Sequence, residues 1–124
     1  MTDYSIEYLS SALKFCFANR DAIEKSANCG CFECLTIFPA KLSTFMKERN
    51  EYETGWCPIC GLDAIIGDYS LPLSKSFLLA MRKQYFETES YLDPIKDADY
   101  VEATVREFNK RRLALGLPEE GYIF

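Results

Sequence analysis

Two segments organise this chain: Cys29-Gly30-Cys31-Phe32-Glu33-Cys34 and, after a gap of 22 residues, Cys57-Pro58-Ile59-Cys60-Gly61. Each contains a Cys-x-x-Cys turn, and two such turns at about this separation are typical of a zinc site made of four cysteines. The two-residue gap lets the backbone turn beneath the ion while both sulfurs point toward it. The pattern therefore predicts one Zn²⁺ held by Cys31, Cys34, Cys57 and Cys60.

The rest of the composition indicates what kind of zinc site this is. The chain contains no histidine, so a tetrahedral site must be rich in sulfur. Four thiolates close the coordination sphere and leave no position for water, which is the property of structural zinc sites. We therefore expect the ion to stabilise the fold and expect no enzymatic activity. Gly30 and Gly61 flank the two turns, where they suit a backbone that doubles back sharply.

Two further cysteines leave alternatives open. Cys29 could replace Cys31 or Cys34 as a ligand, whereas Cys16 is most simply a small buried hydrophobe. All six could also be reduced core cysteines, or Cys57 and Cys60 a redox pair. A redox pair of thioredoxin type requires a βαβ setting, which does not surround this motif.

Two other kinds of site compete with a closed zinc centre. Cys31-Phe32-Glu33 followed by Cys57-Pro58-Ile59-Cys60 imitates a zinc deaminase, in which Glu33 would shuttle protons. Cys34 as a fourth ligand and the position of Pro58 argue against it. Asp63 and Asp68, together with Glu53, suggest an oxygen-ligated metal such as Mg²⁺. Ordinary turn chemistry explains both aspartates more simply.

Length and composition favour a single soluble domain. The chain has 124 residues, of which 48% are apolar and 27% are charged, so it can bury one core. We expect one domain over 1–124, consisting of an N-terminal helical segment (1–27), a zinc-binding core (28–86) and a C-terminal helical extension (87–124). No apolar run is long enough to span a membrane, and no secretory signal begins the chain. The prediction is a cytoplasmic protein with reduced thiols.

Hydrophobic periodicity predicts the elements around the two turns. Helices are expected over 2–27 with a break at Asn19-Arg20-Asp21, over 39–49 after Pro39, over 75–86 after an N-cap at Ser74, and over 97–115 before Gly116. A short β segment reaches Phe38, a loop occupies 50–55, and a strand is expected over 62–67. The predicted class is α+β: a small four-cysteine element of zinc-ribbon or treble-clef type packed among four or five α-helices.

From about Arg20 to Phe86 the chain resembles a group of small, poorly characterised bacterial proteins labelled only as cytoplasmic proteins. The matching features are Cys29-Gly30-Cys31-Phe32-Glu33-Cys34-Leu35, Phe38-Pro39, Cys57-Pro58-Ile59-Cys60-Gly61-Leu62-Asp63-Ala64-Ile65-Ile66-Gly67-Asp68 and the helix after Pro72. The resemblance implies a zinc-ribbon or treble-clef module and brings no activity with it. The segment 87–124 lies outside it.

Net charge gives the expectation for partners. The chain carries −5, and four thiolates with one Zn²⁺ add −2, which makes −7. We expect a non-catalytic module that binds a protein, such as a basic enzyme or toxin that it inhibits or to which it confers immunity. A nucleic-acid module is the alternative, with Arg82-Lys83 and Lys110-Arg111-Arg112 as basic clusters. The apolar stripe on the last helix either packs on its own domain or forms a homodimer; it consists of Val101, Val105, Phe108 and Leu115.

Overall fold

The computed structural model describes residues 4–47, 51–86 and 98–120. The predicted beginnings of the first and last helices at Thr2 and Asp97, and the predicted helix end near Arg49, lie outside these ranges. The described residues form helices and small antiparallel sheets, so the predicted α+β class is confirmed. None of their helices has the length and apolar character required to cross a lipid bilayer.

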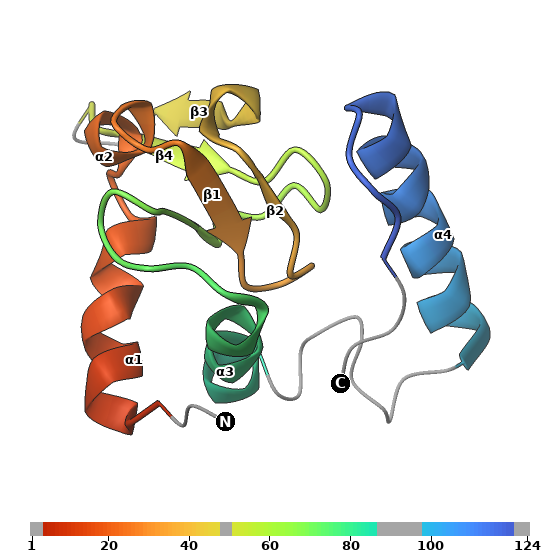
Figure 1. Cartoon of the computed structure of the whole chain (residues 1–124), viewed down its shortest axis with the longest axis horizontal. Helices are drawn as coiled ribbons and strands as arrows, with labels where there is room; N and C mark the ends of the chain where they lie inside the picture. Colours follow the sequence, from red (N-terminus) through yellow and green to blue (C-terminus); the bar gives the residue numbers. More distant parts are fainter. Residues whose placement is uncertain (1–3, 48–50, 87–97, 121–124) are drawn as a thin grey trace.

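Figure 1 shows the order of the elements along the chain. The α-helices are α1 (Ile6–Leu13), α2 (Arg20–Glu24), α3 (Lys75–Tyr85) and α4 (Ala98–Ala114). The strands are β1 (Asn28–Cys31), β2 (Ile37–Pro39), β3 (Thr44–Lys47), β4 (Glu53–Trp56) and β5 (Ile65–Gly67). Two short 3₁₀ turns lie at η1 (Lys14–Cys16) and η2 (Ala40–Leu42).

The strands form two small antiparallel sheets. One has three strands in the order β2-β1-β5, and the other is the β3-β4 hairpin. Strand β1 is central, and all of Cys29, Gly30 and Cys31 are buried in it. The central strand therefore carries its cysteines directly into the core.

The segment after Pro39 corrects two predictions. We expected a helix to about Arg49, but only the 3₁₀ turn η2 forms, and residues 44–47 are strand β3. The expected loop at 50–55 is also wrong over residues 53–55, which belong to β4 and pair with β3. The spacing of Leu42, Phe45 and Met46 fits a helical face. Pairing with β4 outweighs that local signal, as tertiary context often does.

The first helical segment is broken, as predicted, but the break comes earlier than expected: α1 ends at Leu13, and Arg20 and Asp21 already belong to α2. Asn19 also acts differently from the predicted cap. Its side chain makes no capping hydrogen bond to α2. Instead, its amide oxygen accepts a hydrogen bond from Gly55 N at 2.8 Å, and its amide nitrogen donates to the carbonyl oxygens of Phe15 (2.9 Å) and Ile65 (3.0 Å). Asn19 is buried, so it joins the N-terminal segment to β4 and β5 inside the core.

Gly55 lies in β4, facing Ile23 of α2 and Ile65 of β5. A Cβ atom at this position would lie 2.4 Å from Ile23 Cδ1 and 2.8 Å from Ile65 Cδ1. We expect Gly55→Ala to lower the free energy of unfolding by about 1–3 kcal/mol through overpacking, measured by urea denaturation. Ile23→Val removes the closest methyl group, so the cost of Gly55→Ala should be smaller in that background. Equal costs in both backgrounds would contradict the steric explanation.

The start of α3 and the end of α4 follow the sequence prediction, to within one residue at the end of α4. Ser74 Oγ accepts a hydrogen bond from Phe77 N at 3.1 Å at the start of α3. At the end of α4, Gly116 has φ +77°, Gly116 N donates to Leu113 O (3.1 Å) and Leu117 N donates to Arg112 O (2.8 Å). These are the two hydrogen bonds of a Schellman motif.

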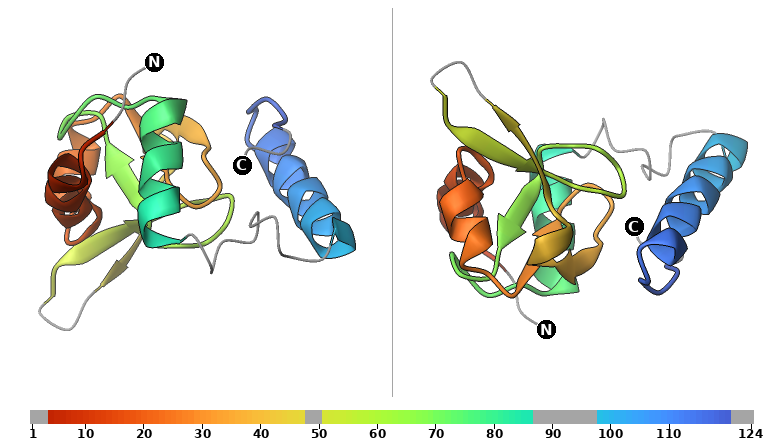
Figure 2. Two further views of the ribbon diagram at one scale, coloured as in Figure 1. Left: turned by 90° about the horizontal axis from the view of Figure 1, so that it is seen from below. Right: turned by 90° about the horizontal axis from the view of Figure 1, so that it is seen from above.

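Helices α1 and α4 lie on opposite sides of the molecule (Figures 1 and 2). Helix α3 packs beside α1, and Tyr4 and Tyr8 contact the Phe77 ring edge-on. On α4, Val101 and Phe108 are buried within the chain, whereas Leu115 is exposed. The buried part of the predicted stripe thus packs on its own chain, and dimerisation through α4 stays a prediction.

Candidate metal centre

The sheet register brings the two cysteine turns together. The first turn leaves the end of β1 and the second connects β4 to β5. Strands β1 and β5 pair with Cys31 opposite Ile65, and Phe32 N donates to Ala64 O at 3.0 Å just beyond them. The pairing of these strands therefore places two turns that are far apart in sequence at one edge of the sheet.

The four sulfurs predicted as ligands converge at this edge. The Sγ atoms of Cys31, Cys34, Cys57 and Cys60 all lie within 4.8 Å of one another. Two of the separations join the two turns: Cys31 Sγ lies 3.5 Å from Cys60 Sγ, and Cys34 Sγ lies 3.5 Å from Cys57 Sγ. Such a group could hold one metal ion.

The backbone of each turn is arranged in the same way. The amide two residues after the first cysteine donates to its sulfur: Glu33 N to Cys31 Sγ at 3.4 Å, and Ile59 N to Cys57 Sγ at 3.3 Å. The amide of each first cysteine also donates five residues ahead, to Thr36 O (3.0 Å) or to Leu62 O (2.9 Å). Amides directed at sulfur stabilise thiolate charge, as a metal site requires.

Each turn ends with a residue in the left-handed conformation. Gly61 has φ +79° after Cys60, and Leu35 has φ +62° after Cys34. Our prediction for Gly61 is confirmed, but that for Gly30 is wrong. Gly30 lies in β1, where a Cβ atom would lie 2.9 Å from Leu78 Cδ1. Its small size serves packing against α3, and Leu35 takes the equivalent of the Gly61 position.

Gly61 allows a clean test of backbone strain beside the centre. No atom lies within 4 Å of a Cβ built on Gly61, so a substitution meets only the cost of positive φ. We expect Gly61→Ala to lower the free energy of unfolding by about 1–2 kcal/mol. Gly61→Asn should cost less because asparagine tolerates this conformation. Denaturation of both variants at equal zinc content measures the difference, and equal losses for Ala and Asn would contradict it.

The pKa values of Cys31 and Cys34 indicate that the sulfur group stabilises one negative charge, on Cys34. Burial raises the pKa of Cys31 well above its usual range, and contacts with the other three sulfurs add to this. Burial acts in the same direction on Cys34, but hydrogen bonds from Cys31, Cys57 and Cys60 outweigh it and hold the pKa of Cys34 well below its usual range. One thiolate is thus stabilised by three neighbouring S–H groups. A cation between the four sulfurs would take the place of those protons.

Four basic side chains bind the carbonyl groups of the two turns, a feature that our sequence analysis missed. From α3, Lys75 Nζ donates to Leu35 O and Arg82 Nη1 donates to Glu33 O at 3.4 Å. From α4, Arg112 Nη2 donates to Cys34 O at 3.2 Å and Arg111 Nη1 donates to Ile59 O at 2.6 Å. These contacts hold both helices against the two cysteine turns.

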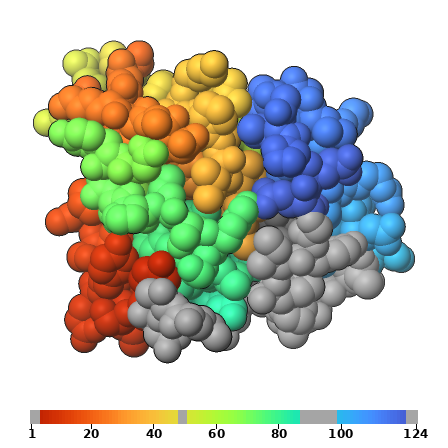
Figure 3. Space-filling model, viewed as in Figure 1, coloured from red at the N-terminus to blue at the C-terminus, as the bar shows by residue number. Residues whose placement is uncertain are grey.

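Figure 3 shows the dark blue surface of the C-terminal part of the chain against the gold surface of the segment that follows the first turn. Arg112 is buried and also donates from Nε to Thr36 Oγ1 at 3.0 Å. Thr36 Oγ1 lies 3.2 Å from Cys34 Sγ, and this contact helps to lower the pKa of Cys34. Two adjacent basic residues in a helix, such as Arg111 and Arg112, do not indicate by themselves that one is buried. Only the tertiary structure shows that they bind carbonyl groups of the cysteine turns.

The remaining cysteines lie outside the group. Cys29 is buried in β1, where Ser43 Oγ donates to its sulfur at 3.6 Å, and burial raises its pKa to about 11. Cys16 donates from Sγ to Leu13 O at 3.0 Å, and burial raises its pKa to about 12. Cys16 is therefore buried in the way the sequence predicts.

The candidate oxygen ligands do not come together. Asp68 accepts hydrogen bonds from Ala27 N (2.9 Å) and Asn28 N (3.1 Å), and Glu53 pairs with Arg20. Asp63 is exposed. Within the ranges that the structure describes, the four cysteines are the one group of three or more potential metal ligands that converge. Asp68 thus serves the turn before β1.

Comparisons of this chain with protein family models, with curated proteins and with solved structures find no match. The resemblance to the small bacterial cytoplasmic proteins therefore stays a prediction.

Proposed function

We propose that this chain binds a single Zn²⁺ through Cys31, Cys34, Cys57 and Cys60, and that the ion has a structural role. The supporting observation is the convergence of four sulfurs within 4.8 Å of one another. Thiolates are soft ligands that suit zinc, and four of them fill a tetrahedral site. With no open position on the ion, the deaminase alternative has no place for its water, and we propose no catalysis.

The proposed metal is tested directly by its stoichiometry. Purified, freshly isolated chain should contain one zinc per molecule by elemental analysis and by native mass spectrometry. Cys34→Ser should lower this content, whereas Cys29→Ser should leave it unchanged because Cys29 lies outside the sulfur group. Absence of stoichiometric zinc, or its loss in Cys29→Ser alone, would overturn the proposal.

We further propose that the zinc-stabilised fold is a binding module for a protein partner with a basic surface, and that it acts in the cytoplasm. Two observations support a basic partner. The net charge is −5 before the metal centre is counted, and four of the 14 basic side chains are directed at carbonyl groups of the turns. Tyr52, Tyr69 and Tyr100 are more than half exposed and offer the kind of anchor that interfaces favour.

The same contacts weigh against the nucleic-acid alternative. Each of its two basic clusters contains one buried arginine, Arg82 or Arg112. A buried guanidinium cannot reach a phosphate, so each cluster has less positive charge available to neutralise a backbone.

Affinity purification with a charge-reversed bait tests the partner proposal. The bait is the zinc-loaded chain, and the matched control carries Glu7→Lys, Asp63→Lys and Glu119→Lys at exposed positions. We expect a basic protein to bind the unchanged chain, to elute as salt rises and to be lost from the control at equal zinc content. Recovery of nucleic acid instead, or of the same proteins with a bait lacking all four cysteine ligands, would refute it.

A further inference from the structure

One of the four sulfur ligands differs from the others in its access to solvent. Cys31, Cys34 and Cys57 are at most 3% exposed, whereas Cys60 is partly exposed. Cys60 lines a cavity of about 410 Å³ between the second cysteine turn, the end of α3 and α4. The other walls of this cavity are formed by Glu33, Leu62, Phe86, Tyr100, Thr104 and Phe108.

We propose that Cys60 is the position at which a small, neutral hydroperoxide reaches the metal centre, and that Cys31 then forms a disulfide with it and releases the ion. The inference rests on the zinc site proposed above. The new element is oxidation of one ligand, Cys60, followed by a disulfide with Cys31.

The choice of Cys60 follows from accessibility and charge. Oxidation of cysteine requires thiolate character and access, and the cavity gives access to only one of the four coordinating sulfurs. A centre of four thiolates and one Zn²⁺ carries −2, which disfavours an anionic oxidant. Cys16 and Cys29 are 2% and 0% exposed, so neither competes by access.

Cys31 is proposed as the disulfide partner because its sulfur is in close contact with that of Cys60. Its Sγ atom lies 3.5 Å from Cys60 Sγ, on the other turn. In the first step the Cys60 sulfur attacks the hydroperoxide: an S–O bond forms, the O–O bond breaks and hydroxide (or alkoxide) leaves. The Cys31 sulfur then attacks the sulfenic sulfur of Cys60: the S–S bond forms, the S–O bond breaks and hydroxide leaves. The two sulfurs lose two electrons in total, and the peroxide gains them.

Loss of two thiolates leaves Cys34 and Cys57, which do not hold zinc alone. The disulfide also joins the two turns whose carbonyl groups bind Arg111 and Arg112 of α4. Oxidation would therefore change the two turns to which α4 is hydrogen-bonded.

The first arm of the experiment uses the unchanged, zinc-loaded chain. After zinc content has been measured, limiting iodoacetamide is added and the labelled cysteine is identified by peptide mass spectrometry. We expect Cys60 to be labelled first. If zinc is present and another cysteine is labelled first, this inference fails while the proposed zinc site stands. If no zinc is present, the proposed function itself fails.

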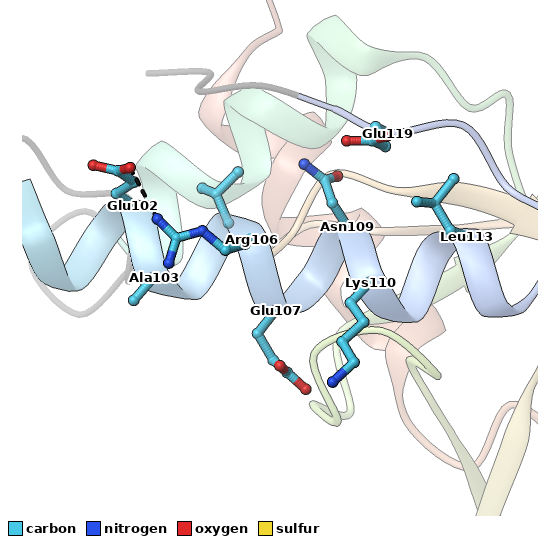
Figure 4. A pocket seen from close by; sticks show the side chains of 9 residues that line it. Glu102, Ala103, Arg106, Glu107, Asn109, Lys110, Leu113 and Glu119 are labelled. Atoms are coloured by element: carbon cyan, nitrogen blue, oxygen red, sulfur yellow. Dashed lines mark hydrogen bonds and ion pairs between the residues drawn. The ribbon is translucent and has the colours of Figure 1, made fainter.

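The second arm follows zinc release under hydrogen peroxide with a chromophoric chelator and maps the disulfide. We expect one Cys31–Cys60 disulfide per zinc released, and a Cys57–Cys60 disulfide would overturn the assignment of Cys31. Thr104→Trp, which places a large ring in the cavity, should slow release about fivefold or more. Ala103→Trp is the matched control, because Ala103 lines a separate groove along α4 (Figure 4). Equal slowing by both variants would refute entry through the cavity.

Discussion

Removal of the proposed zinc ion by a strong chelator, or its loss through Cys57→Ser, is expected to lower the free energy of unfolding by about 10 kcal/mol. A domain of this size is stable by about 5–15 kcal/mol in total, so the cooperative unfolding transition should be weakened severely or lost. No other single change in this chain should have so large an effect.

The reason is that the strands that bring the two cysteine turns together are short. The sheets contain three and two strands, each only three or four residues long, and such sheets are marginal by themselves. Cys57 is 2% exposed, and its sulfur lies 3.5 Å from that of Cys34 on the other turn. Without the ion, the buried sulfurs of the two turns would attract each other only through weak S–H hydrogen bonds.

Two signals measure this loss. Circular dichroism follows thermal unfolding, and fluorescence of Trp56, the single tryptophan, reports on the residue that precedes Cys57. The control is Cys16→Ser, which lies outside the sulfur group and should cost far less and leave zinc content unchanged. An unchanged melting transition in chelator, or equal losses in the two variants, would contradict a structural role for the ion.

The sequence sufficed for those parts of the fold that depend on local rules. The Ser74 cap, the end of α4 before Gly116 and a strand that ends at Gly67 all follow from residues close to one another in the chain. The predicted start of that strand at Leu62 is wrong, because β5 begins only at Ile65. The convergence of the two cysteine turns was equally predictable, because a Cys-x-x-Cys pair has few alternative uses in a chain without histidine.

The features that escaped prediction all depend on contacts between distant residues. Phe45 fits a helical face as well as a strand, and only its pairing with Gly55 decides between them. Gly30 resembles a turn glycine until Leu78 of α3 is placed against it. Likewise, Arg82 and Arg112 resemble solvent-exposed basic residues until their carbonyl partners, 49 and 78 positions away along the chain, are known.

Arg112→Met is expected to lower the free energy of unfolding by about 3–5 kcal/mol, the usual cost of removing one partner from a buried charged network. Arg112 is 2% exposed, donates to Cys34 O and Thr36 Oγ1, and lies 3.5 Å from the carboxylate of Glu120. Methionine keeps the length of the side chain but leaves these acceptors without their donor. Glu120, which also pairs with Lys75, would lose its buried cation.

The substitution should also weaken zinc binding by about 10-fold to 100-fold, since residues that hydrogen-bond to the surroundings of a metal ligand have effects of this size. Arg111→Met is the matched control. Its guanidinium is partly exposed, donates to the carbonyl of Ile59 in the second turn and pairs with Glu107 on its own helix. Arg111→Met should therefore lower the free energy of unfolding by only about 1 kcal/mol. Denaturation, a zinc competition titration and amide exchange along α4 compare the two variants. If they lose equal stability and equal zinc affinity, burial of Arg112 is not what couples α4 to the metal centre.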